Sequence, residues 1–183
     1  CQILLEDYSG KLDDDGQRRL ESLVGLCQRL SRLIDDLLTY SQIGRTEPEA
    51  APIDLNEIVA DVIDTLGAAI DERNAIVRVK GSLPTVEADR VLVGEVFRNL
   101  IANALRHTPS GGLVEVDVRA ADDDAILTVR DTGVGIAPDR YDAIFDAFSQ
   151  EHAEVSRRYG GTGLGLTICQ RLVRMLSGEI TVQ

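Results

Sequence analysis

The most regular hydrophobic pattern of the chain lies in residues 16–43. Apolar side chains recur there in alternating steps of three and four, at Leu20, Leu23, Cys27, Leu30, Ile34 and Leu37. A repeat of 3.5 residues is typical of helices that pack in a bundle or coiled coil. Ser9-Gly10 interrupts an earlier helical pattern that begins at residue 1, and the aspartates at 13–15 suit a helix N-terminus. We therefore predict a helical hairpin over residues 1–45, with a short first arm.

This hairpin has two interpretations. It could be an amphipathic pair of helices that packs on its own domain. It could also join a second copy in a multi-helix bundle. Leu26, Leu33 and Leu38 widen the apolar stripe, and a wide stripe favours the bundle. We therefore expect a homodimer formed through the hairpin.

A break rich in Gly, Pro and charge follows the hairpin, at residues 44–52. We expect a linker at 46–52 and a second domain at 53–183. Apolar residues between 55 and 70 line one helical face after Asp54, and Asp89 suits the N-cap of a long helix at 90–106. A last helix begins within 160–166 and ends before Gly178.

Alternating positions predict the strands of this domain. They lie at 76–80, near Val86, and at 114–119 and 125–130, which form a hairpin. Pro138 opens a predicted short helix that reaches Phe148, and residues 179–183 have a strand pattern. The fold class is therefore α+β: a helical hairpin followed by a two-layer α/β sandwich, with a mixed sheet and helices on one face.

The charge and the cysteine content limit which binding partners and which cellular compartment we expect. The net charge is -12 and no run of Lys or Arg occurs, which argues against nucleic-acid binding. The three cysteines are widely spaced, without CxxC, and indicate neither a disulfide framework nor zinc. No membrane span is predicted and no membrane contact is expected within this sequence. We expect a cytoplasmic location, although a longer protein could be membrane-anchored.

Three polar patterns carry candidate chemistry. The helix at 90–106 has a polar stripe with two asparagines, whose oxygens can ligate a hard cation. Its members are Glu95, Asn99, Asn103, Arg106 and His107. The alternative is a solvated face with chance asparagines.

The second pattern, Asp131-Thr132-Gly133-Val134-Gly135-Ile136, directly follows a strand. A carboxylate there can accept a hydrogen bond from an amine such as that of adenine, and the glycines allow close approach to a flat ring. An ordinary turn is the alternative.

The third pattern, Gly160-Gly161-Thr162-Gly163-Leu164-Gly165-Leu166, opens the last helix. Glycines and a helix N-terminus favour phosphate oxygens. The segment lacks the Gly-Lys-Ser/Thr of a Walker A motif, and the protein-kinase motifs are absent. The polar stretch 149–160 before it suits a lid.

Together these blocks resemble the histidine-kinase branch of the ATPase superfamily that includes gyrase, the mismatch-repair ATPases and the heat-shock chaperone. RNLIANALRHTP resembles the N box, DTGVGI the first glycine box, FDAF the F box and GGTGLGL the second glycine box. The hairpin resembles the dimerisation and phosphotransfer hairpin of these kinases. Its LLTYSQIGR ending is similar to that of phytochrome-like and PAS-linked members.

The resemblance implies ATP and Mg²⁺ as cofactors and a response-regulator receiver domain as partner. It implies that Asn103 holds Mg²⁺ with support from Asn99, and that Arg106 and His107 contact phosphate or ribose. Asp131 is then expected to bind the adenine amine. The remaining implied nucleotide contacts are Gly133, Gly135, Ile136, Gly161, Thr162, Gly163, Leu164 and Gly165.

The histidines depart from the family pattern. The family's phospho-acceptor histidine lies in an H box in the first hairpin helix, whereas this sequence has only His107 and His152. We expect the acceptor upstream of Cys1. A serine kinase of the anti-sigma type and a nucleotide-gated interaction module remain alternatives. The hairpin argues against the first, and the intact Asn99, Asn103 and Asp131 argue against the second.

Overall fold

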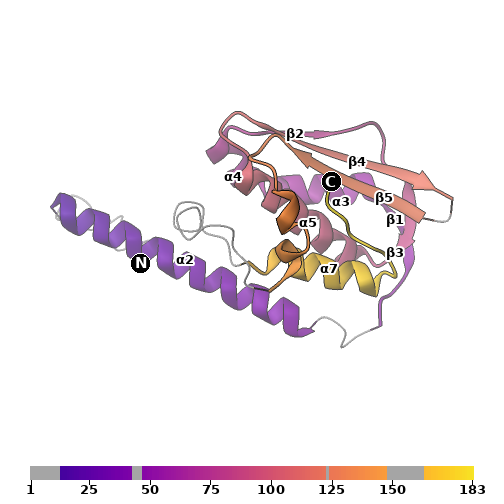
Figure 1. Ribbon diagram of the computed structural model, residues 1–183, viewed down its shortest axis with the longest axis horizontal. Coiled ribbons are helices and arrows are strands. Elements are labelled where there is room, and N and C mark those ends of the chain that lie inside the picture. Colours follow the sequence, from indigo (N-terminus) through magenta and orange to yellow (C-terminus); the bar gives the residue numbers. More distant parts are fainter. Residues whose placement is uncertain (1–12, 43–46, 123, 148–162) are drawn as a thin grey trace.

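The computed structural model describes residues 13–42, 47–122, 124–147 and 163–183. It consists of one long helix and an α+β domain (Figure 1). The long helix, α2 (Asp14–Gln42), follows the predicted heptad segment and confirms the second arm of the hairpin as a helix. The first arm, residues 1–12, lies outside the described residues. None of the described helices is both long enough and apolar enough to span a bilayer.

The domain contains two small sheets. β1 (Ala51–Asp54) pairs antiparallel with β3 (Thr85–Ala88). The second sheet has the order β2-β4-β5. β2 (Ile76–Val79) runs parallel to β4 (Leu113–Ala121), and β4 runs antiparallel to β5 (Asp124–Asp131). The sheet is therefore mixed, and the predicted hairpin at 114–130 is confirmed.

Four helices cover one face of the sheet (Figure 1). They are α3 (Leu55–Thr65), α4 (Gly67–Arg73), α5 (Arg90–His107) and α7 (Gly165–Met175). One core joins Val114, Val116 and Val118 of β4 with Phe97 and Ile101 of α5. A second core lies between α5 and α7 and is formed by Val96, Leu164, Ile168 and Leu172. These two cores fix α5 between the sheet and α7.

Helix caps explain where the elements begin. The carboxylate of Asp54 accepts a hydrogen bond from the Asn56 backbone N–H at 2.8 Å, and Asp89 accepts from Val91 and Leu92 at 2.9 and 3.1 Å. Both side chains satisfy N–H groups that have no partner within the helix. The predicted caps of α3 and α5 are thus confirmed.

Four expectations about secondary structure were wrong. β1 begins within the predicted linker. The helix expected at 55–70 is divided at Leu66, where the backbone leaves helical geometry. The helix expected after Pro138 is a pair of 3-10 turns, η2 (Pro138–Arg140) and η3 (Ala143–Phe145). Residues 179–183 form no strand, since they pair with none of the described strands.

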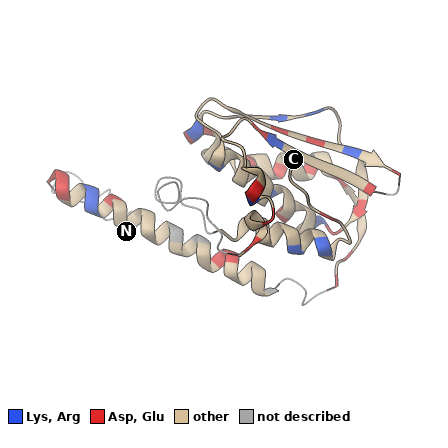
Figure 2. Cartoon of the chain, in the orientation of Figure 1, with Lys and Arg blue, Asp and Glu red and all other residues tan. Residues whose placement is uncertain are grey.

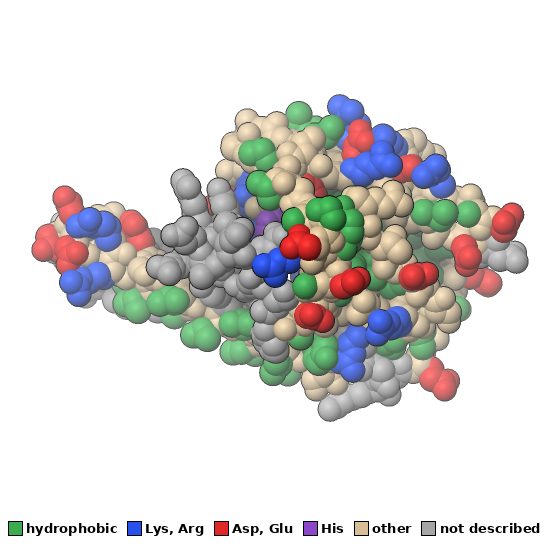
Figure 3. Space-filling view, in the orientation of Figure 1, with side chains coloured by type: hydrophobic (Ala, Val, Ile, Leu, Met, Phe, Trp, Pro, Cys, Tyr) green, Lys and Arg blue, Asp and Glu red, His purple; other side chains and the backbone are tan. Residues whose placement is uncertain are grey.

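The surface of α2 is charged at its N-terminal end and hydrophobic further along. Charged residues gather at its N-terminal end (Figure 2), where Arg19 forms an ion pair with Asp15. Hydrophobic side chains line the helix further along (Figure 3). Six apolar residues of α2 each keep about half or more of their surface exposed: Leu23, Leu26, Leu30, Ile34, Leu37 and Leu38. We call these six residues the leucine stripe. Soluble monomers rarely expose so continuous an apolar surface.

Candidate active site

Asn99 lies at the centre of the candidate site, on the face of α5 that meets α7. Its side chain is buried, with 8% of the residue exposed. The amide nitrogen Nδ2 donates to the backbone oxygen of Glu95 at 2.8 Å. A Cβ placed on Gly165 would lie 3.4 Å from Oδ1 of Asn99. The second glycine box and the first N-box asparagine are therefore brought together, as the resemblance implies.

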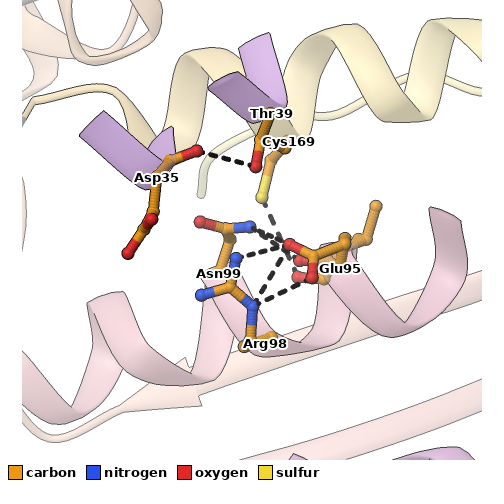
Figure 4. Close-up of polar contacts among 7 residues, drawn as sticks. Asp35, Thr39, Glu95, Arg98, Asn99 and Cys169 are labelled. Carbon is orange, nitrogen blue, oxygen red and sulfur yellow. Dashed lines mark hydrogen bonds and ion pairs between the residues drawn. The ribbon is translucent and has the colours of Figure 1, made fainter. Parts of the chain in front are cut away.

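Glu95 and Arg98 form a polar cluster beside Asn99 (Figure 4). Nε of Arg98 donates to both carboxylate oxygens of Glu95, at 3.2 and 3.1 Å, and Nη2 donates to Oε2. The bonded carboxylate of Glu95 raises the pKa of Arg98 above its ordinary value, and the negative charge of Asp36 on α2 acts in the same direction.

Asn103, Arg106 and His107 continue along α5 from Asn99, and all three are half-buried. The end of this helix is fixed by neighbours. Nη1 of Arg73 donates to the backbone oxygen of Arg106 at 3.0 Å, and the buried Thr108 hydroxyl donates to Ala104 O at 2.7 Å. The final turn of α5 is therefore tied to α4 and closed by its own C-terminal threonine.

The Asp131–Gly133 turn packs against that final turn. Oδ1 of Asp131 accepts from the Gly133 backbone N–H at 2.8 Å. In the described part of the chain, its other oxygen, Oδ2, accepts no hydrogen bond. A Cβ on Gly133 would lie only 2.5 Å from the backbone oxygen of His107. Glycine is required there because the turn approaches the α5 backbone too closely for any side chain.

Two further residues had no role assigned from the sequence: Gly112, which lies outside the motifs, and Thr132 of the first glycine box. A Cβ on Gly112 would collide with the Thr108 side chain, and Thr132 Oγ1 accepts from the Leu113 N–H at 2.9 Å. Gly112 and Thr132 therefore join the end of α5, the start of β4 and the end of β5. The Gly111-Gly112 pair directly after an N box is the signal that could have found this contact.

The rest of the first glycine box is more open. Gly135 is exposed and has φ +70°, a left-handed conformation that favours glycine. Val134 is 84% exposed, and Ile136 is half-buried. This segment connects Asp131 to the first 3-10 turn, η2.

The second glycine box begins α7. Gly163 has φ +73°, Leu164 is 2% exposed in the α5–α7 core, and Gly165 is the first residue of α7. The Thr167 hydroxyl donates to the backbone oxygen of Phe145 at 2.9 Å, which joins this box to the F box. Gly161, Thr162, the predicted lid at 149–160, Phe148 and His152 lie outside the described residues.

Cys169, one turn into α7, is a structural residue. It is fully buried, and its Sγ lies 3.8 Å from the backbone oxygen of Val96 (Figure 4). Burial raises the pKa of this thiol to about 12. A thiol that stays protonated is a poor nucleophile. Cys169 therefore contributes to the contact between α5 and α7 rather than to chemistry.

The donor set suits a hard cation. Asn99 commits its amide hydrogens to Glu95, so its oxygen is the atom left for a ligand. No group of three or more His, Cys, Asp or Glu that could hold a metal occurs in the described ranges. Carboxamide oxygens together with phosphate oxygens are a ligand set that Mg²⁺ accepts. The residues present therefore fit the implied ion.

Comparison with known proteins identifies the domain. Residues 88–183, more than half of the chain, match the model described as histidine kinase-, DNA gyrase B- and HSP90-like ATPase. The chain belongs to this ATPase family. Its N box, both glycine boxes and the F box all lie within the matched residues. The chain therefore carries the ATP-binding catalytic domain that the motifs predict.

Relatives extend the similarity beyond that domain. The cyanobacterial phytochrome B of Nostoc is 37% identical over 99% of this chain, which spans 24% of that protein. The crystal structure of full-length ShkA in complex with AMPPNP is similar to this chain, with 27% identity and a TM-score of 0.69, and the match covers 96% of this chain and 38% of ShkA. A histidine kinase solved with the response regulator TrrA shares the fold, with 21% identity, a TM-score of 0.69 and coverage of 97% and 50%. The chain thus spans about a quarter of the phytochrome that it resembles.

Proposed function

We propose that this chain is the catalytic part of a sensor histidine kinase. It transfers the γ-phosphate of ATP to a histidine, from which the phosphate passes to an aspartate of a response regulator. The observation that carries the proposal is the meeting of three motifs around α5. Gly165 contacts Asn99, and Gly133 contacts the backbone of His107 at the other end of the helix. This arrangement brings candidate phosphate, cation and adenine ligands to one side of the domain.

Each residue has a proposed role in binding. The carboxamide oxygens of Asn103 and Asn99 face a cation that is bound with the phosphates, and Arg106 and His107 donate to phosphate or ribose oxygens. The carboxylate of Asp131 accepts from the adenine amine, while Gly133, Gly135 and Ile136 line the ring. Backbone N–H groups at 161–165 and the N-terminus of α7 face the phosphates.

The proposed chemistry is mainly positioning and charge neutralisation. Mg²⁺ bound here would neutralise charge that develops on the phosphates. The protein side chains orient the nucleotide, and a loop that covers the phosphates would exclude water. No side chain of this domain needs to become covalently modified for the transfer.

The leucine stripe supports the proposed homodimer. An exposed apolar helix face is stabilised when a second helix removes it from water. In the proposed kinase the two hairpins form a bundle that presents the acceptor histidine. The receiver domain of the response regulator is proposed to dock on this bundle.

Analysis of the phosphorylated residue in the longer protein tests this function. Incubation with Mg²⁺ and ATP should give phosphate that is labile in acid and stable in alkali, as expected for phosphohistidine. Acid-stable phosphate on a protein serine would indicate the anti-sigma type of kinase. Nucleotide binding without any phosphate transfer would indicate an interaction module. The present sequence, which lacks an H-box histidine, should itself acquire no stoichiometric phosphohistidine.

A further inference from the structure

Two oxygens of Glu95, one on the backbone and one on the carboxylate, face the amide nitrogen of Asn99. Nδ2 of Asn99 lies 2.8 Å from the backbone oxygen of Glu95 and 3.5 Å from its Oε2. Both acceptors belong to one residue and lie on the same side of the amide. If the carboxamide were turned over, its oxygen would face these two acceptors. The arrangement therefore favours Nδ2 toward Glu95 and Oδ1 away from it.

Arg98 fixes the carboxylate that performs this task. It forms an ion pair with Glu95 in which both carboxylate oxygens accept. The pair is partly shielded, with 37% and 30% of the two side chains exposed. Paired donors restrict a carboxylate to one orientation more strongly than a single contact does. Arg98 therefore acts on Asn99 through Glu95.

Other ion pairs of the same helix do not share this geometry. Arg90, at the start of α5, contacts Glu57 at 3.2 Å and Asp61 at 3.0 Å. The two carboxylate side chains are 66% and 72% exposed, and neither contacts an asparagine of the N box. Arg90 is thus a matched control for Arg98, since both are arginines of α5 that bind carboxylates.

We propose that Glu95 and Arg98 are positioning residues that hold the Asn99 carboxamide with its oxygen toward the bound Mg²⁺-nucleotide. The inference rests on the proposed function, because it requires Asn99 to face that ligand. Outer partners of metal-binding side chains fix ligand orientation and commonly affect metal affinity by about ten-fold or more. Glu95 takes this outer position because it contacts the Asn99 amide, and Arg98 takes it because it binds Glu95.

Calorimetry of this chain with ATP, with and without Mg²⁺, tests the proposal. Glu95→Gln and Arg98→Gln should each lower the Mg²⁺-dependent part of ATP affinity by about ten-fold. Affinity without Mg²⁺ should change by less than about two-fold, since Asn99 acts through the cation. Arg98→Lys, which keeps the charge but not the paired donors, should have an intermediate effect. Arg90→Gln should bind as the parent does.

A charge swap separates positioning from simple stabilisation. Glu95→Arg combined with Arg98→Glu restores an ion pair three residues apart and should recover the thermal stability lost in Glu95→Arg alone. It should not recover Mg²⁺-dependent affinity, because an arginine at 95 can only donate and repels the Asn99 amide hydrogens.

Two results would overturn the proposal. One is parental Mg²⁺-dependent affinity in Glu95→Gln. The other is a swap variant that regains affinity together with stability. A parent chain that fails to bind Mg²⁺-ATP would overturn the proposed function, and this inference with it. A parent that binds beside unaffected variants would overturn the inference alone.

Discussion

Asp131 ends β5 with one carboxylate oxygen bound to its own turn and the other facing no protein donor in the described residues. An ionised carboxylate can only accept a hydrogen bond. Adenine offers an amine at position 6, whereas guanine carries a carbonyl there. We therefore expect the chain to bind ATP and ADP more tightly than GTP.

Replacement of this carboxylate tests the base preference. A hydrogen bond to a charged group contributes about 1.5–3 kcal/mol, so Asp131→Asn should weaken ATP binding about ten-fold or more. It should also reduce the preference over GTP, because a carboxamide can turn its donor outward. Asp124→Asn, at the opposite end of the same strand, is the control and should leave both affinities unchanged. Calorimetry that finds equal ATP and GTP affinity in the parent would contradict the assignment of the adenine ligand.

Among the secondary-structure elements, α5 depends most clearly on its cap. Asp89 accepts from the Leu92 and Val91 N–H groups and from that of Glu49, at 3.0 Å for the last. Mainly the Leu92 bond lowers the pKa of Asp89 below its ordinary 3.8. A lowered pKa in the folded state means that the stabilisation is complete above about pH 4–5. It is lost as the pH falls through the depressed value.

This cap should be visible in stability measured against pH. At pH 7, Asp89→Ala should lower the free energy of unfolding by about 0.5–2 kcal/mol. The difference from the parent should shrink as the pH falls below about 4. Asp89→Asn, which caps without titrating, is the control. Urea unfolding followed by circular dichroism supplies the values, and a difference that stays constant from pH 7 to pH 3 would contradict this account.

Local signals account for the elements that the sequence could predict. The period of α2, the caps of α3 and α5, and the alternation of β4 and β5 all lie within the segments that they specify. β1 was missed because its partner is distant: Ala51 pairs with Ala88, and Pro52 resembles a linker residue. The break at Leu66 is followed directly by Gly67, a residue type common just after a helix end, but the apolar face continues to Ile70 and so favoured a single helix.

In the candidate site, too, some residues could be predicted from the sequence and others could not. The motifs identified Asn99, Asn103, Asp131 and the glycines, because the N box and the glycine boxes occur in a fixed order. The motifs could not show that Arg98 donates to both carboxylate oxygens of Glu95. An arginine and a glutamate three residues apart are common on solvated helix faces, and the value of this pair comes from the nearby Asn99 amide.

At the scale of the whole molecule, the leucine stripe on α2 determines the expected assembly. Leu30 is 58% exposed and Ile34 is 59% exposed near the middle of the helix. Leu30→Asp would place an unpaired charge in the proposed bundle, which is strongly unfavourable. We expect the parent to sediment as a dimer and this variant as a monomer. Gln28→Asp, which adds the same charge at an exposed position of α2 that faces away from the stripe, should remain dimeric, and a monomeric parent would contradict the prediction.

Among the described residues, the long helix packs against the domain near its C-terminal end. Tyr40 packs against the α5–α7 core, and the guanidinium of Arg171 lies 4.1 Å from the centre of its ring. From Tyr40 back to Asp14, a rise of 1.5 Å per residue gives a length of about 39 Å. A tilt of roughly 10° at Tyr40 would therefore move Asp14 by about 7 Å. Because Tyr40 packs beside the α5–α7 core that contains the candidate site, a small change in that core would be amplified into a large displacement at the N-terminal end of the helix.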